Sequence, residues 1–189
     1  MVGAHEISFS LCDSLSELEQ IKTLQSANLK SLLEPEEQDR EGFVTAVYSI
    51  DLLKKMNDHH RAILAKVGGR VVGYSLVVSP AFTGHHPLLD DLIYNCNLLS
   101  FKGRKLESCT YIVVGQLCVD KAFRKRGVAQ GLYGHFQKTY AQTFEYCVTD
   151  VDRKNTRSLK THRSKGFTVI GTLTYGGAFW DVVLWEWRN

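Results

Sequence analysis

A short stretch in the second half of the chain combines glycine with clustered positive charge at the expected start of a helix. An apolar run over 111–119 is followed by the basic turn Arg124-Lys125-Arg126 and then by Gly127, where a helical pattern begins. The first turn of a helix presents unpaired amides and the positive end of the helix dipole, and glycine lets the backbone approach a ligand closely. Flanking Lys and Arg attract further negative charge. The combination predicts a phosphate-binding site.

The motif does not fit the two common nucleotide-binding loops. It lacks the Gly-Lys-Ser or Gly-Lys-Thr of a Walker loop, and it is not a Gly-x-Gly-x-x-Gly fingerprint. Spacing alone fits equally well a turn with a solvated basic face. The charge distribution and the residues downstream of the motif indicate what the segment binds.

Positive charge is concentrated in the same half of the chain. The 189 residues carry a net charge of +3, but residues 121–165 hold eleven Lys and Arg against three acidic residues, a local +8, which leaves −5 for the rest. A nucleic-acid-binding module is one reading of this segment. However, the basic residues cluster around Gly127 and Asn155 rather than forming a stripe with interleaved aromatic residues, which favours one compact anion over a polymer.

Two motifs at this point resemble the GNAT superfamily of acetyl-CoA-dependent N-acetyltransferases. The family's pyrophosphate loop, Gln or Arg, two residues, Gly, one residue, then Gly or Ala, is matched by residues 124–129. A family-typical strand, Asn, helix and Gly-Phe series is matched downstream. Its members here are Asp150-Val151-Asp152, Asn155, Ser158, His162 and Gly166-Phe167.

The resemblance implies an α/β fold of one domain spanning residues 1–189. It implies a central mixed, mostly antiparallel twisted sheet of about seven strands, with helices on both faces. Two parallel strands, over 111–119 and 146–152, are expected to splay apart. Edge groups left without a ladder partner there can pair with a peptide-like ligand as with an added strand.

The implied co-substrate is acetyl-CoA, with its pantetheine arm between the splayed strands and its diphosphate at the helix start. The residues expected to hold it are Leu117, Cys118, Val119, Arg124, Lys125, Arg126, Gly127, Val128, Ala129, Gln130, Asn155 and Ser158.

The implied reaction is direct attack of a primary amine on the acetyl thioester through a tetrahedral intermediate. A backbone amide near Cys118 or Val119 can stabilise the oxyanion. An alkyl ammonium has a pKa of about 10.4, so a base or a water path must take its proton. Asp150, five residues before Asn155, is the candidate base, although a carboxylate that only pairs with a nearby cation is an equal alternative. Gln116 stands where other members carry a Glu base, and an amide cannot accept a proton at working pH.

His162 occupies the position where the family often has a Tyr that protonates the departing thiolate. An imidazole with a pKa of about 6.5 can donate or relay a proton, so His162 is the candidate acid; the alternative is that it only packs beside the pantetheine arm. With Gln116 and His162 at these positions, an acetyl-CoA or acyl-CoA-binding protein without acetyl transfer stays an open alternative.

Cysteine and histidine give weaker signals. The five cysteines include no Cys-x-x-Cys pair, and a covalent role for Cys118 is less expected than that of an inert buried thiol. His59-His60 and His85-His86 have adjacent side chains that point apart, and no third ligand is suitably spaced, so no metal is expected.

The first half of the chain predicts the elements that position this site. Residues 5–11 read as a strand, 14–24 as a capped helix, 34–43 as an acidic loop, 50–56 as a helix, and 61–78 as a hairpin turning at Gly68-Gly69. Residues 80–110 read as an inserted loop with a short helix, where acceptor specificity is expected. The C-terminal part predicts a helix over 158–164 ended by Gly166 and strands over 167–173 and 179–187.

The acceptor is expected to be a small-molecule or peptide amine. The acidic first third is compatible with a cationic acceptor such as a polyamine, an aminoglycoside or a Lys side chain, but solubility explains those charges equally well. No stretch resembles a membrane span or a secretion signal, so a cytoplasmic protein is expected. A monomer or a homodimer is expected.

Overall fold

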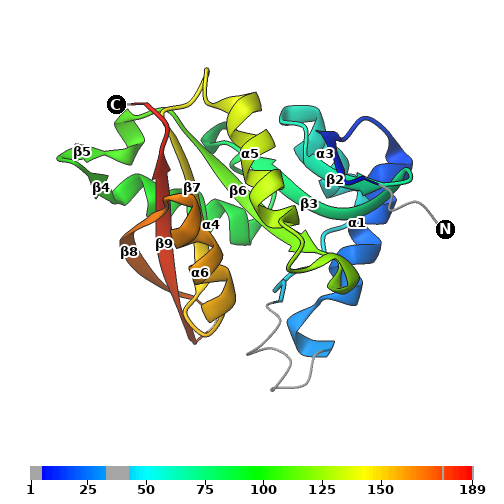
Figure 1. Ribbon diagram of the computed structural model, residues 1–189. Helices are drawn as coiled ribbons and strands as arrows, with labels where there is room; N and C mark the ends of the chain where they lie inside the picture. Colours follow the sequence, from blue (N-terminus) through cyan, green and yellow to red (C-terminus); the bar gives the residue numbers. More distant parts are fainter. Residues whose placement is uncertain (1–5, 33–42, 176, 189) are drawn as a thin grey trace.

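The part of the chain that the structure describes forms a twisted seven-stranded sheet with helices on both faces (Figure 1). The structure is a computed structural model, and it describes residues 6–32, 43–175 and 177–188. The strand order is β1-β2-β3-β6-β7-β9-β8, and every neighbouring pair is antiparallel except β6 and β7. The predicted fold class is therefore confirmed. The strands are β1 (Ser8–Leu11), β2 (Ile63–Val67), β3 (Arg70–Val78), β6 (Tyr111–Val119), β7 (Tyr146–Asp152), β8 (Thr168–Tyr175) and β9 (Ala178–Glu186).

The N-terminal helices begin at the serine caps that the sequence contains. Helix α1 (Leu15–Ala27) starts with a capping box in which the Ser14 side chain accepts from the Glu17 amide and the Glu17 side chain accepts from the backbone of Ser14. Ser49 caps α3 (Ile50–His59) in a simpler way, by accepting from the Leu52 amide. Both predicted helices are confirmed. The predicted acidic loop lies almost wholly outside the described residues.

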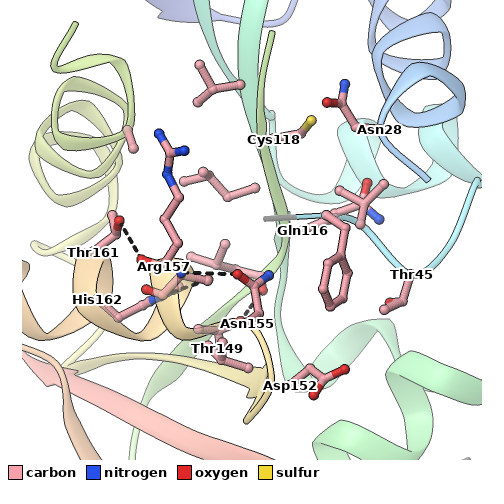
Figure 2. A pocket seen from close by; sticks show the side chains of 18 of the residues that line it. Asn28, Thr45, Gln116, Cys118, Thr149, Asp152, Asn155, Arg157, Thr161 and His162 are labelled. Carbon is pink, nitrogen blue, oxygen red and sulfur yellow. Dashed lines mark hydrogen bonds between the residues drawn. The ribbon is translucent and has the colours of Figure 1, made fainter. Parts of the chain in front are cut away.

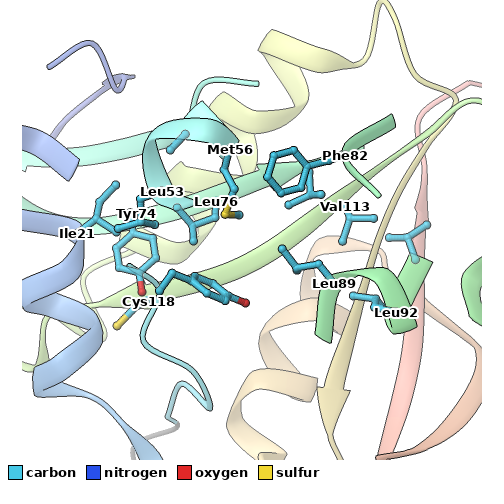
Figure 3. Close-up of a cluster of buried hydrophobic side chains, with 14 of the residues drawn as sticks. Ile21, Leu53, Met56, Tyr74, Leu76, Phe82, Leu89, Leu92, Val113 and Cys118 are labelled. Atoms are coloured by element: carbon cyan, nitrogen blue, oxygen red, sulfur yellow. The ribbon is translucent and has the colours of Figure 1, made fainter. Parts of the chain in front are cut away.

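Two hydrophobic layers hold the helices on the sheet. One layer joins α1, α3 and α4 (Pro87–Leu98) to the face that carries Tyr74, Leu76 and Val113, and Figure 3 shows side chains from these elements meeting in it. The other layer packs α5 (Val128–Tyr140) and α6 (Thr156–Lys165) on the opposite face. Because the two faces are covered by different helices, a ligand that enters between the strands can contact both sets.

The segment between β3 and β6 carries more structure than the sequence indicated. The predicted short helix is α4, which is confirmed. It is followed by a small two-stranded hairpin, β4 (Ser100–Phe101) and β5 (Arg104–Lys105), which the sequence did not predict. Strands of two residues are too short to show the alternation by which a strand is recognised.

The two parallel strands part after three residue pairs. Partners across β6 and β7 end at Val113↔Val148, whereas β7 stays paired with β9 along its whole length. The last link is side-chain to backbone, where Thr149 Oγ1 donates to the carbonyl oxygen of Val114 at 2.8 Å. Figure 1 shows the two strands diverging beyond this point. The predicted splay is confirmed, and it leaves one edge of β6 without a neighbouring strand.

Glycines end or join elements where the sequence placed them. Gly68 and Gly69 have φ of 56° and 83° and form the turn between β2 and β3, and Gly166 ends α6 with φ 102°.

None of the helices in the described parts of the chain is both long and apolar enough to cross a bilayer.

Candidate functional site

A cavity of about 290 Å³ opens where β6 and β7 part. Figure 2 shows side chains that line it, and the labelled ones come from β6, β7, α6 and its N-cap, the C-cap of α1, and the segment that follows residue 42. Every site residue expected from the sequence lines this cavity except Arg126. The structure therefore brings together residues from three separate parts of the motif region. These are Leu117, Cys118 and Val119 of β6; Arg124, Lys125, Gly127, Val128, Ala129 and Gln130 around the start of α5; and Asp150, Asn155, Ser158 and His162 of β7 and α6.

The amino end of α5 is open toward the cavity. Gly127 is its N-cap, with φ 76° and ψ 6°, and it makes no side-chain cap hydrogen bond. In contrast, Ser14 and Asn155 cap α1 and α6 with their side chains. Lys125, two residues earlier, is also left-handed, with φ 63°. A glycine-containing turn that leads into uncapped helical amides is a concave anion-binding site.

The three basic residues before Gly127 make different contacts. Arg124 is held by the protein, since its Nε donates to the Val119 carbonyl at 3.1 Å and its guanidinium donates to Asn28 Oδ1 at 2.6 Å. Arg126 lies over the ring of Phe123, with 5.3 Å from its Cζ to the ring centroid. Lys125 is exposed and lines the cavity. Among the three, Lys125 is the one best placed to meet a bound phosphate.

Gln116 anchors a polar cluster beneath the cavity. Its Oε1 accepts from Gln25 Nε2 at 2.8 Å and from the hydroxyl of Tyr74, and its Nε2 donates to the Ala46 carbonyl at 2.9 Å. The amide is thus occupied on both sides by the protein itself. A structural role explains why an amide stands at this position.

Cys118 lies next to this cluster and is 5% exposed. Burial raises the pKa of its thiol to about 12, so the thiolate is scarce at neutral pH. This favours the inert thiol expected from the sequence over a covalent nucleophile.

His162 is buried and bonded through both ring nitrogens. Its Nδ1 lies 2.8 Å from the Ser158 carbonyl oxygen, which can only accept, so Nδ1 carries the proton and Nε2 accepts from the hydroxyl of Tyr133. Loss of hydration lowers the pKa of His162 to about 4. The imidazole is therefore neutral at physiological pH, and these contacts fit the packing role that was the alternative to an acid.

Asp150 is a carboxylate that lines the cavity. It is partly exposed and forms no ion pair with any residue that the structure describes. Desolvation raises the pKa of its carboxyl to about 6, and the negative charge of Asp91 adds to the rise. Asp152, on the same face of β7, is instead paired with Lys30 at 2.8 Å. Asp150 is thus the unpaired acid of this face.

Several lining residues were missed by the sequence analysis. Arg157 and Thr161 share with Ser158 the side of α6 that lines the cavity, and Leu88 and Trp180 come from α4 and β9. The helical spacing of Arg157 and Thr161 could have indicated them, because residues four apart share a helix face. Leu88 and Trp180 carried no such signal, since their placement depends on how distant segments pack.

Comparison with known families gives a match over most of the chain. The model of the acetyltransferase (GNAT) family matches residues 21–167. A search of curated protein sequences finds no match.

Solved structures share the fold at low sequence identity. A GNAT-family acetyltransferase from Streptococcus agalactiae superposes with a TM-score of 0.67 at 15% identity, covering 97% of this chain and 96% of that one. The ribosomal-protein-S18-alanine N-acetyltransferase from Escherichia coli gives 0.66 at 9% identity over 97% and 96%. A chain of the NatC complex bound to Gag peptide and CoA gives 0.65 at 16% identity over 96% and 98%. At such identities the likeness concerns the fold alone.

Proposed function

Since the chain belongs to the acetyltransferase (GNAT) family, we propose that it binds acetyl-CoA between β6 and β7 and transfers the acetyl group to a primary amine. One observation carries the proposal. A single cavity connects the uncapped start of α5 to the unpaired carboxylate of Asp150, along strands that share no ladder there. An anion site, a slot and a candidate base are thus arranged in one continuous space.

The lining residues fit the parts of acetyl-CoA. The diphosphate would accept from the first amides of α5, at Val128 to Gln130, with Lys125 adding charge. The pantetheine amides would pair with the free edge of β6 at Leu117 to Val119, as an added strand does. Asn155 and Ser158 would flank the arm from the start of α6.

The chain's own residues would handle the proton. Bound acetyl-CoA supplies an activated acetyl thioester, and a β6 amide near Cys118 or Val119 would stabilise charge on the thioester oxygen. Asp150, with a pKa of about 6, is mostly ionised at neutral pH and can accept the proton that the amine loses on attack. An amine becomes far more acidic as it forms the new bond, so a carboxylate of this pKa suffices as acceptor.

The acid role predicted for His162 has less support. A neutral ring whose nitrogens are both engaged cannot hand over a proton without breaking the contact with Ser158. A thiol with a pKa of about 8.5 is a tolerable leaving group without an acid. We therefore propose that His162 chiefly keeps the Tyr133 hydroxyl bonded and the wall of the slot in place.

Two measurements on the full chain test the proposal. Calorimetric titration with acetyl-CoA should show binding, and thiol release from acetyl-CoA should accelerate when a primary amine from a broad panel is added. Asp150→Asn should retain binding and lose transfer by a factor of about 10² to 10⁴, the usual contribution of a general base. Absence of acetyl-CoA binding would refute the proposal.

A second candidate is an acyl-CoA-binding protein that transfers nothing. The observation in its favour is that Gln116 and His162, at positions where relatives place a base and an acid, are both saturated by internal hydrogen bonds. This candidate predicts binding of acetyl-CoA or a longer acyl-CoA, with thiol release that no amine accelerates.

A further inference from the structure

The inserted helix α4 gives the cavity an apolar wall. Leu88, Leu89 and Leu92 of this helix line it, and Figure 3 shows Leu89 and Leu92 in the apolar layer beside Val113 of β6. Leu88, one residue earlier, is only half-buried. The wall therefore offers a ligand aliphatic surface and no hydrogen-bonding side chain.

Asp150 lies on the sheet face that α4 covers. The charge of Asp150 raises the pKa of the Cys96 thiol, and the charge of Asp91 raises the pKa of Asp150. Cys96 and Asp91 both belong to α4. Only acidic or neutral groups of the helix thus face this carboxylate. A ligand that brings its own positive charge would remove the cost of burying that charge alone.

The second carboxylate of this face is already occupied. Asp152 is 2% exposed and its Oδ2 accepts from Lys30 Nζ at 2.8 Å. Among the residues that the structure describes, a polyamine would meet one unpaired carboxylate, and its second cation would face the apolar wall, where a charge needs water or an acid. One ammonium next to an apolar group matches the cavity better.

Trp180 lines the cavity beside Asp152. It stands opposite Asp152 in the β7–β9 register and its indole lines the cavity. Its Nε1 is shielded from solvent and meets no hydrogen-bond acceptor in the described parts of the chain. The ring supplies apolar surface, and its N–H is a donor that a ligand carbonyl beside the ring would satisfy.

Building on the proposed function, we infer that the acceptor is a monoamine carrying a bulky apolar group, whose ammonium meets Asp150 and whose apolar group packs between Leu88 and Leu92 of α4 and the indole of Trp180. Two sources share this chemistry. One is a free arylalkylamine, and the other is an amino-acyl group with an apolar side chain, whose carbonyl would accept from the Trp180 N–H.

The test compares three probes in the thiol-release assay at equal acetyl-CoA: phenethylamine, phenylalaninamide and putrescine. At least one of the first two should exceed putrescine in kcat/KM by about tenfold or more, the usual discrimination from apolar contact of this size. Putrescine equal to or better than both would overturn the inference. Calorimetry with acetyl-CoA alone distinguishes a wrong acceptor from failure of the proposed function. If the proposed function fails, the protein will not bind acetyl-CoA.

Variants of α4 and β9 locate the effect. Leu88→Ala should lower kcat/KM for the better apolar probe about tenfold while the Kd for acetyl-CoA stays within about twofold. Leu98→Ala, on the exposed side of the same helix (56% exposed), is the matched control and should change neither. Equal kcat/KM in Leu88→Ala and Leu98→Ala would contradict the apolar subsite.

The two sources are distinguished by Trp180→Phe, which keeps an aromatic ring and removes the N–H. If the acceptor is amino-acyl, phenylalaninamide should lose about tenfold more kcat/KM than phenethylamine, because a site built to donate a hydrogen bond discriminates strongly. If both probes change alike, the acceptor is the free amine.

Discussion

Replacing Asp150 with Asn should stabilise the protein while removing its activity. Burial raises the pKa of the folded-state carboxyl from 3.8 to about 6. Each pKa unit corresponds to about 1.36 kcal/mol, so ionised Asp150 lowers the free energy of unfolding by about 2–3 kcal/mol above pH 6. Asn removes the charge and keeps an oxygen that can accept a hydrogen bond. For a chain of this length the midpoint of thermal unfolding should rise by about 5–10 °C.

The pH dependence gives this prediction its sign. Because the folded-state pKa lies above the unfolded-state value, the stability that protonated Asp150 provides is fully present below pH 3.8 and is lost as the pH rises through about 6. The gain in Asp150→Asn should therefore be large at pH 8 and small at pH 4.

Denaturant unfolding of the wild type and the variant at both pH values measures this difference. Asp58→Asn is the matched control, since Asp58 is exposed in an i,i+4 pair with Lys54 and its loss should change stability by less than about 0.5 kcal/mol at either pH. An Asp150→Asn variant that is no more stable at pH 8, or equally more stable at pH 4 and pH 8, would refute the burial argument.

Three further substitutions probe the rest of the site. Gly127→Ala should cost about 1–2 kcal/mol of stability, because the left-handed φ of 76° strains an L residue, although the added Cβ would meet nothing within 4 Å. Its affinity for acetyl-CoA, measured by calorimetry, should also fall. Unchanged affinity would place the diphosphate elsewhere. Cys118→Ala should keep kcat within about threefold, since a thiol with a pKa of about 12 is no nucleophile, whereas complete loss with retained fold would indicate a covalent step. His162→Phe should lower the free energy of unfolding by about 1–3 kcal/mol, because it leaves the buried Tyr133 hydroxyl unpaired. Adding Tyr133→Phe should recover part of that loss. If the effects of the two substitutions simply add in this double-mutant cycle, the two side chains do not interact.

The elements of the fold could be predicted because their signals are local. Ser14 with Glu17 defines the start of α1, Gly68-Gly69 defines a hairpin turn, and Gly166 defines the end of α6. Which strands are parallel, and where they part, is a property of chain topology, and the family resemblance predicted it. The hairpin β4–β5 left no pattern, because two residues per strand are too few to alternate.

The candidate site was predicted in outline, and its chemistry depended on tertiary contacts. The basic turn placed Arg124 to Arg126 in one group, yet packing against Phe123 takes Arg126 away from the cavity and Asn28 engages Arg124. His162 was predicted as an acid from its position in a motif. Its partner Tyr133 lies 29 residues away, and that hydroxyl and the burial of the ring set its protonation state.

The most direct test of the account is the structure of the protein crystallised with acetyl-CoA. We predict diphosphate oxygens within hydrogen-bond distance of the amides of Val128 to Gln130, and a pantetheine arm between β6 and β7 beyond Val113 and Val148. Acetyl-CoA bound elsewhere, with β6 and β7 enclosing nothing but solvent, would contradict the account.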